Sequence, residues 1–196
     1  MTMKSPMKRA VFLDRDGVIT QDPPAYAHRI DQLEIIPKSD EAIRLLNEQN
    51  YTVLVVTNQS GIARGYYQEK DAHVFNDEMK KRLSEKKAHV DGIYYCPHHP
   101  RGKIEQYRKT CTCRKPASGM LLQGAKDFNV DLTQSFIVGD KWRDIQAGKN
   151  VGCTTILVRT GTGNDQPLDQ DPGVDYIVND LYEAVTTIIL KSSPRG

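Results

Sequence analysis

Short runs of apolar residues alternate along the chain with longer segments in which apolar residues recur every three or four positions. The runs have the length of buried β-strands, and the longer segments have the spacing of amphipathic helices. The pattern predicts strands at residues 10–13, 51–56, 92–95, 135–138, 154–158 and 176–178, and helices at 39–50, 68–87, 120–128, 142–150 and from 179 or 180 to 189. Such alternation is typical of βαβ units, so we expect an α/β fold with a mostly parallel central sheet.

Local signals fix some of the boundaries. Ser39 is predicted to cap the first helix, with Asp40 and Glu41 favourably placed in its first turn. Residues 20–37 are rich in proline and polar side chains and are predicted to form a loop over the strand ends, and residues 96–116 are expected to be irregular. No internal repeat or interdomain linker is evident, so residues 1–196 are expected to form one domain.

Composition narrows the class of protein. Charged residues of both signs are mostly interspersed, 27 basic against 25 acidic, which argues against a nucleic-acid partner. Residues 1–9 are not followed by the apolar core of a signal peptide, and no run is long enough to span a bilayer, so we expect a cytoplasmic protein. Its four cysteines then favour thiol or metal chemistry over disulfides.

Polar residues follow three of the predicted strands. The first strand is followed by Asp14-Arg15-Asp16-Gly17, the second by Thr57-Asn58, and the fourth by Gly139-Asp140. Ligands bind outside the carboxyl ends of parallel strands, and two acids one residue apart repel each other unless a cation lies between them, so Mg²⁺ is the expected ion. In isolation the two acids are more often a solvated turn, and a glycosyltransferase Asp-x-Asp would leave Thr57 and Asp140 unexplained. An EF-hand is excluded because the closing glutamate is missing.

A second cluster lies in the irregular segment. Cys96-Pro97-His98-His99 is followed by Cys111-Thr112-Cys113, with twelve residues between His98 and Cys111. Three thiols and an imidazole suit tetrahedral zinc, and four protein ligands make the ion structural. The alternative is that unrelated cysteines share one loop, with a Cys111–Cys113 disulfide disfavoured by strain. Spacing does not choose between His98 and His99, and Cys153 is interpreted as a small buried apolar residue.

Four motifs occur in a fixed order: Asp14-Arg15-Asp16-Gly17-Val18, Thr57-Asn58, Lys115-Pro116, and Gly139-Asp140 with Asp144. In this respect the chain resembles the haloacid dehalogenase (HAD) superfamily of phosphotransferases. The resemblance implies a HAD-like Rossmannoid three-layer sandwich with a zinc-binding loop at about 96–113 and no large cap domain.

The same resemblance implies a set of roles. Asp14 would be the nucleophile that forms an aspartyl-phosphate, and Asp16 the general acid and base. Thr57 and Lys115 would stabilise the phosphoryl group. Catalytic Mg²⁺ would be held by Asp14, Asp140 and the Asp16 carbonyl. Asp144 is expected to orient Lys141 or a metal-bound water.

Longer segments narrow the resemblance. Residues 57–65, 93–100, 111–116 and 138–141 look like those of the phosphatases that remove the 7-phosphate of D-glycero-D-manno-heptose 1,7-bisphosphate, in the synthesis of nucleotide-activated heptose for lipopolysaccharide core or related glycans. This implies a small sugar bisphosphate as the substrate, and zinc at Cys96, His98, Cys111 and Cys113. The implied substrate-binding residues are Asp22, Tyr26, Asn58, Gln59, Ser60, Arg64, Arg114 and Lys141. The spacing and residues of 22–26 depart from the family pattern.

Two alternatives remain at this point. Histidinol-phosphate phosphatases share the motifs and a similar zinc loop, but theirs is shorter, so the twelve residues after His98 favour the heptose enzyme. A non-catalytic sugar-phosphate binding protein would be expected to lose its nucleophile, whereas Asp14, Asp16 and Lys115 are intact. The absence of a long apolar surface stripe favours a monomer.

Overall fold

The computed structural model describes residues 6–22 and 26–192 of the chain. Its centre is one six-stranded sheet of order β3-β2-β1-β4-β5-β6, and every neighbouring pair of strands is parallel. The strands are β1 (Ala10–Leu13), β2 (Thr52–Asn58), β3 (Gly92–Cys96), β4 (Phe136–Gly139), β5 (Thr154–Val158) and β6 (Tyr176–Val178). The predicted α/β fold with a parallel sheet is confirmed.

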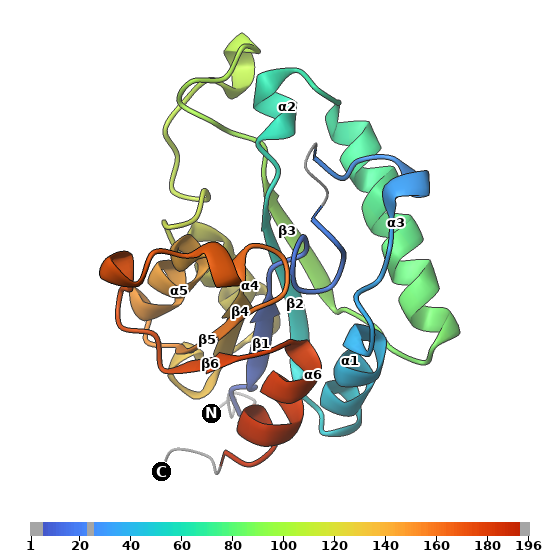
Figure 1. Ribbon diagram of the computed structural model, residues 1–196, viewed down its shortest axis with the longest axis vertical. Coiled ribbons are helices and arrows are strands. Elements are labelled where there is room, and N and C mark those ends of the chain that lie inside the picture. The colour runs from blue at the N-terminus through green and yellow to red at the C-terminus, as the bar shows by residue number, and fades with distance from the viewer. Residues whose placement is uncertain (1–5, 23–25, 193–196) are drawn as a thin grey trace, which may run out of the picture.

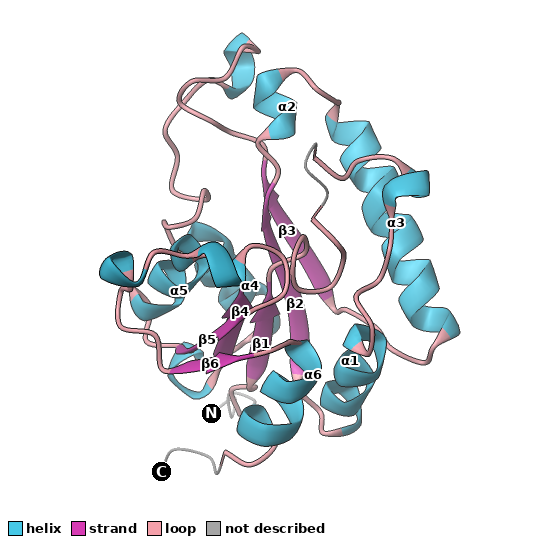
Figure 2. Ribbon diagram, viewed as in Figure 1, coloured by secondary structure: helices cyan, strands magenta, loops and turns pink. Residues whose placement is uncertain are grey.

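Helices cover both faces of the sheet (Figure 1), so the coloured elements of Figure 2 form three layers. The helices are α1 (Ser39–Glu48), α2 (Gly61–Arg64), α3 (Glu69–Glu85), α4 (Gly119–Phe128), α5 (Trp142–Lys149) and α6 (Leu181–Glu183), and α6 continues as a wider π-helical turn over Ala184–Ile189. Short 3₁₀ turns lie at Ile30–Gln32, Glu105–Tyr107, Leu132–Gln134, Gly163–Asp165 and Leu168–Gln170.

Strand β1 shows why the layers form. Its four residues are fully buried, and successive side chains point to opposite faces. Val11 and Leu13 join the core that includes α1, α3 and α6, whereas Ala10 and Phe12 join the core that includes α4 and Ala147 of α5. A continuous apolar run is therefore what a strand covered on both sides requires.

Three local details differ from the sequence predictions or refine them. Ser39 is the first residue of α1 and not its cap, because its hydroxyl donates to the Val18 carbonyl (3.0 Å), and Lys38 takes the cap position with a φ of 67°. Helix α2 was not predicted, since four residues are too few to show a helical period. Of the two candidate caps for α6, Asp180 is the one whose side chain accepts from the Glu183 amide.

Within the described part of the chain, no helix combines the length and the apolar character needed to cross a bilayer. All the polar strand ends lie at one edge of the sheet, because the strands are parallel.

Candidate active site

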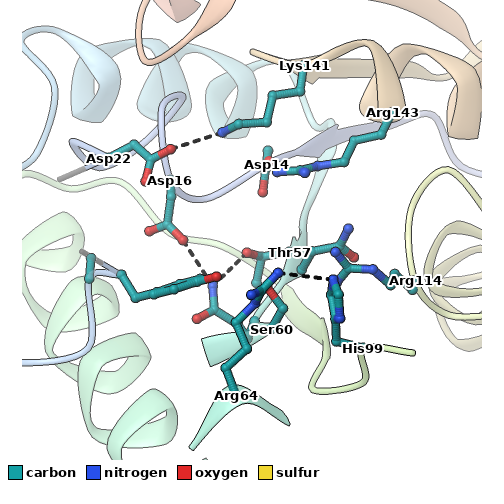
Figure 3. Close-up of a pocket in the computed structure, with 14 residues that line it drawn as sticks. Asp14, Asp16, Asp22, Thr57, Ser60, Arg64, His99, Arg114, Lys141 and Arg143 are labelled. Carbon is teal, nitrogen blue, oxygen red and sulfur yellow. Dashed lines mark hydrogen bonds and ion pairs between the residues drawn. The ribbon is translucent and has the colours of Figure 1, made fainter. Parts of the chain in front are cut away.

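A pocket of about 290 Å³ lies at the carboxyl edge of the sheet (Figure 3). Parallel pairing of β1 with β2 and β4 brings their polar ends to it, and the Asp14 amide donates to the Val138 carbonyl at 3.0 Å. The lining residues are Asp14, Asp16, Asp22, Tyr26, Ala27, Thr57, Asn58, Gln59, Ser60, Arg64, His99, Arg114, Lys141 and Arg143. The pocket thus gathers the predicted substrate-binding residues and adds Ala27, His99 and Arg143.

Lys115 provides a fixed positive charge beneath the pocket. Its side chain is fully buried, and its Nζ lies 3.1 Å from Asp14 Oδ1 and 2.7 Å from Asp144 Oδ1. The same Nζ donates to the Val56 carbonyl at 2.6 Å. Its main chain is clamped by the Asn58 amide, which donates to the Lys115 carbonyl at 3.0 Å and accepts from the Lys115 N–H at 3.1 Å. Asn58 therefore positions the lysine as well as lining the pocket.

Asp14 is held in its ionised form. Burial by itself would raise the pKa of this carboxyl, but the positive charges of Lys115, Lys141 and Arg143 outweigh burial and lower the pKa below its ordinary value. The Arg15 amide adds a hydrogen bond to Asp14 Oδ1 at 2.8 Å. A permanently anionic carboxylate at the pocket wall is what a nucleophile requires.

The Asp16 side chain is part of a hydrogen-bond network with Arg15 and Gln59. Its carboxylate accepts from Arg15 Nε at 2.9 Å and from Gln59 Nε2 at 3.0 Å. The Gln59 amide also donates to Thr57 Oγ1 and accepts from Arg15 and from the Tyr67 hydroxyl. Both ends of the Gln59 amide are thus engaged with protein groups, so in this structure Gln59 orders Asp16 and Thr57 around the pocket that all three line.

An acidic cluster beside the nucleophile fits a divalent cation. Carboxylate oxygens of Asp14, Asp140 and Asp144 lie within 4.8 Å of one another. Burial, followed by the charges of Asp144 and Asp14, raises the pKa of Asp140 to about 6. Oxygen donors of this kind match Mg²⁺.

Asp144 is occupied by protein groups. Its Oδ1 faces Lys115, and its Oδ2 accepts from the main-chain N–H of Lys141 at 3.0 Å. Asp144 thus contacts Lys141 through the main chain, and it also faces the Lys115 ammonium, which the expected role in orienting Lys141 or a metal-bound water did not include. Asp14 and Asp140 contact protein groups as well, and these two acids are the ones that the family resemblance assigned to the ion.

Gly17 lets the first loop approach this acidic cluster. Its φ is +90°, and a Cβ at this position would lie 2.5 Å from Asp140 Oδ2. Only glycine combines that backbone conformation with such a close approach.

Lys141 links the acidic cluster to the first loop. Its Nζ lies 2.9 Å from Asp140 Oδ2 and 2.9 Å from Asp22 Oδ2. Tyr26 also lines the pocket and stacks on Tyr66 with ring centroids 5.2 Å apart. The intervening residues 23–25, part of the predicted substrate loop, lie outside the described residues.

The side of the pocket away from Asp16 and Asp22 carries positively charged side chains. In Figure 3 the acids Asp16 and Asp22 lie on one side of Asp14, and Arg114 lies beside His99 on the other. Arg64 Nη2 lies 3.2 Å from His99 Nε2, and Arg114 donates to the His98 carbonyl at 3.2 Å.

Sequence reasoning missed three residues of this pocket, and two of them, His99 and Arg143, had a positional signal. His99 adjoins a predicted zinc ligand, and Arg143 stands three positions after Asp140 at the same strand end.

The cysteine cluster converges as expected for zinc. The Cys113 Sγ lies 3.2 Å from the Sγ atoms of Cys96 and Cys111, and 3.4 Å from His98 Nδ1. Cys96 Sγ lies 3.5 Å from Cys111 Sγ and 3.7 Å from His98 Nδ1. A zinc ion with bonds of about 2.3 Å has donor atoms about 3.7 Å apart, so the four atoms need to separate only slightly.

The structure also decides between the two histidines. His99 is turned away from the thiols, since its Nδ1 accepts from the Arg101 amide at 3.1 Å. His98 is the imidazole that faces them, as the family resemblance implied. Cys153 is buried in the core with Met120 and Ala147, in agreement with its apolar interpretation.

Comparisons with known proteins identify the family. A family model described as HAD-hydrolase-like matches residues 112–184. D-glycero-beta-D-manno-heptose-1,7-bisphosphate 7-phosphatase of Salmonella typhi is 42% identical over 181 residues, which cover 91% of this chain and 94% of the relative. The protein of the same name from Pasteurella multocida is 47% identical over 166 residues, which cover 84% and 87%.

A solved structure gives the same result. The D,D-heptose 1,7-bisphosphate phosphatase of B. bronchiseptica, complexed with magnesium and phosphate, superposes with a TM-score of 0.84 at 35% identity, covering 94% of this chain and 99% of that one. The fold is thus that of a HAD-like hydrolase. Within that class, the chain belongs to the family of D-glycero-beta-D-manno-heptose-1,7-bisphosphate 7-phosphatases. The resemblance inferred from the sequence motifs is confirmed.

Proposed function

We propose that this protein is a Mg²⁺-dependent phosphatase that removes the 7-phosphate of D-glycero-β-D-manno-heptose 1,7-bisphosphate in the synthesis of nucleotide-activated heptose. The observation that carries the proposal is the ionised Asp14, which is buried against the Lys115 ammonium at the wall of a pocket with an arginine-rich side. The names of the relatives support the substrate and its β anomer. The magnesium and phosphate of the B. bronchiseptica relative support the reaction class.

The residues divide the reaction into two steps. A carboxylate oxygen of Asp14 attacks phosphorus, the bond between phosphorus and the C7 oxygen breaks, and Asp16, which enters this step in its protonated form, gives that oxygen a proton. Water then attacks the aspartyl-phosphate while Asp16 takes a proton from it, which releases inorganic phosphate and restores Asp14. Lys115 and the Thr57 hydroxyl stabilise the charge on the phosphoryl oxygens.

Two metal ions complete the proposal. Asp14, Asp140 and the Asp16 carbonyl would hold Mg²⁺, which when bound offsets the repulsion between the nucleophile and the anionic substrate. Cys96, His98, Cys111 and Cys113 would hold zinc with no open position, so its role is to order the loop that precedes Arg114 and Lys115. Reduced thiols in this cluster suit a cytoplasmic enzyme, and we expect it to act as a monomer.

The test is a comparison of substrates. Inorganic phosphate release in Mg²⁺ buffer should be fastest with the β-anomeric heptose bisphosphate, slower with the α anomer, and slowest with histidinol phosphate. Asp14→Asn should lower kcat by roughly 10⁴- to 10⁶-fold, because it removes the nucleophile, and serves as the control for contaminating phosphatases. Asp77→Asn, a change at an exposed position of α3, should have no effect. Preference for histidinol phosphate would refute the substrate, and normal turnover by Asp14→Asn would refute the nucleophile.

A further inference from the structure

Arg143 is a cation in the active-site pocket without a protein partner. It lies in the first turn of α5, lines the pocket and reaches toward Asp14 in Figure 3. Within residues 6–22 and 26–192, its side chain has no hydrogen bond and no ion pair, and its buried Nε atom is unpartnered. A half-buried guanidinium left in this state has lost water without gaining an acceptor, which is unfavourable unless a ligand supplies one.

The two lysines beside Asp14 and Asp140 have carboxylate partners. Lys115 faces Asp14 and Asp144, and Lys141 faces Asp22 and Asp140. In contrast, the described residues offer no carboxylate partner to the three arginines of the pocket, which are Arg64, Arg114 and Arg143. In and beneath this pocket, the two lysines therefore neutralise acidic side chains of the protein, whereas the three arginines are available to an anionic ligand.

Arg114 and Arg143 are also close enough to repel each other. Burial is the first cause that lowers the pKa of Arg114, and the positive charge of Arg143 is the second. Like charges held together at a pocket wall favour an anion between them, and the planar fork of a guanidinium matches the oxygens of phosphate.

We propose that Arg143, together with Arg114, binds the phosphate that is not transferred, so that Arg143 determines selectivity for a bisphosphate over a monophosphate. This inference rests on the proposed function, which supplies a substrate with two phosphates. The transferred phosphate already has Lys115 and Thr57 beside Asp14, whereas the side of the pocket with Asp16 and Asp22 would repel a second dianion.

The experiment measures kcat/KM for heptose 1,7-bisphosphate and for heptose 7-phosphate, which lacks the second anion. Arg143→Gln should lower the value for the bisphosphate on the order of 10- to 100-fold, mainly through KM, because a charge-assisted contact to the ground state is lost. The value for the monophosphate should change by less than about threefold. Arg143→Lys should recover part of the loss, since it keeps the charge but not the fork.

Arg44→Gln is the matched control, because Arg44 pairs with Glu41 and Glu48 on α1 and is absent from the pocket lining. Thermal melting checks that each variant is folded. In the Asp14→Asn background, calorimetry of both ligands should show the same selective loss on adding Arg143→Gln.

Three results would overturn the assignment. An equal loss with both substrates, carried by kcat, would place Arg143 on the transferred phosphate instead. No loss with either substrate, or a wild type that does not prefer any sugar bisphosphate over its monophosphate, would remove the second phosphate site. A wild type that prefers a different sugar bisphosphate would refute only the heptose assignment, because the ratio can then be measured on that sugar.

Discussion

The two polar centres of this molecule are built in opposite ways. At the strand ends, buried residues such as Lys115, Asp140 and Asp144 are held by the sheet and by one another. In the zinc loop, most residues from Pro100 to Thr110 are exposed, and the ends of the loop meet where four donor atoms converge. The comparison teaches that contacts among buried protein groups hold the charges at the strand ends, whereas we expect the order of the exposed loop to depend on what the donor atoms bind.

The two centres meet at one point in the chain. Cys113 is followed directly by Arg114, which donates to the carbonyl of the ligand His98, and then by Lys115, which is clamped by Asn58. A metal bound in the loop would therefore hold the Arg114-Lys115 segment from the Cys113 side. Strand β2 holds the same segment through Asn58. Variants that disturb only one side separate the two contributions.

The largest effect is expected from the sheet side. Asp144→Asn removes one of the two carboxylates that face the buried Lys115 ammonium, so the lysine is left to pair with Asp14. We expect kcat to fall roughly 10²- to 10³-fold, the range seen when one stabilising group is removed from an active site. Breaking a buried ion pair should also lower the free energy of unfolding by about 3 kcal/mol. Steady-state kinetics and urea unfolding measure the two effects.

Asp175→Asn is the control for Asp144→Asn. Asp175 pairs with Lys149 and accepts from Thr155, but it does not line the pocket, so its replacement should affect stability and leave kcat unchanged. If Asp144→Asn kept kcat within about threefold of the wild type, Asp144 would have no role in orienting Lys115.

A smaller effect is expected from the loop side. Cys111→Ser should reduce zinc from about one equivalent to well below it and lower kcat/KM by roughly 10- to 100-fold, because Arg114 and Lys115 lose one of their two supports. Elemental analysis of protein purified without chelator, together with kinetics, measures this. Cys153→Ala should keep the metal, since Cys153 lies in the core. Full zinc content in Cys111→Ser would exclude Cys111 as a ligand.

Sequence reasoning recovered what depends on local pattern. The apolar runs gave six strands, and ordered motifs gave Asp14, Thr57, Lys115 and Asp140, because the carboxyl ends of parallel strands must share one edge. The cluster of three cysteines and a histidine followed from residue type and spacing, and the family resemblance picked His98, which the structure shows facing the thiols.

What the sequence could not give depends on long-range contacts. The hydroxyl of Ser39 bonds to Val18, twenty-one positions away, and this contact displaced the predicted cap. Arg143 reads as one more polar residue of an amphipathic helix, and its place beside Arg114 appears only after folding. The partner of Asp144 is likewise Lys115, twenty-nine positions away, and no spacing rule connects them.

The smallest effect concerns the ion at the strand ends. Asp140 must lose its proton to bind Mg²⁺, and its pKa of about 6 in the metal-free protein means that protons compete with the ion below that pH. Asp14, whose pKa is lowered, remains ionised over the same range. The apparent affinity for Mg²⁺ should therefore be constant above about pH 7 and weaken by up to about tenfold for each pH unit below 6.

Calorimetric titration with Mg²⁺ at several pH values measures this affinity. Asp22→Asn is the matched control, because Asp22 also pairs with Lys141 but lies outside the acidic cluster, so it should keep the same dependence on pH. An affinity that stayed constant down to pH 5 would mean that Asp140 is not a ligand. Lys141 contacts Asp140 in this structure. Such a result would mean that Lys141, and not Mg²⁺, neutralises the charge of Asp140.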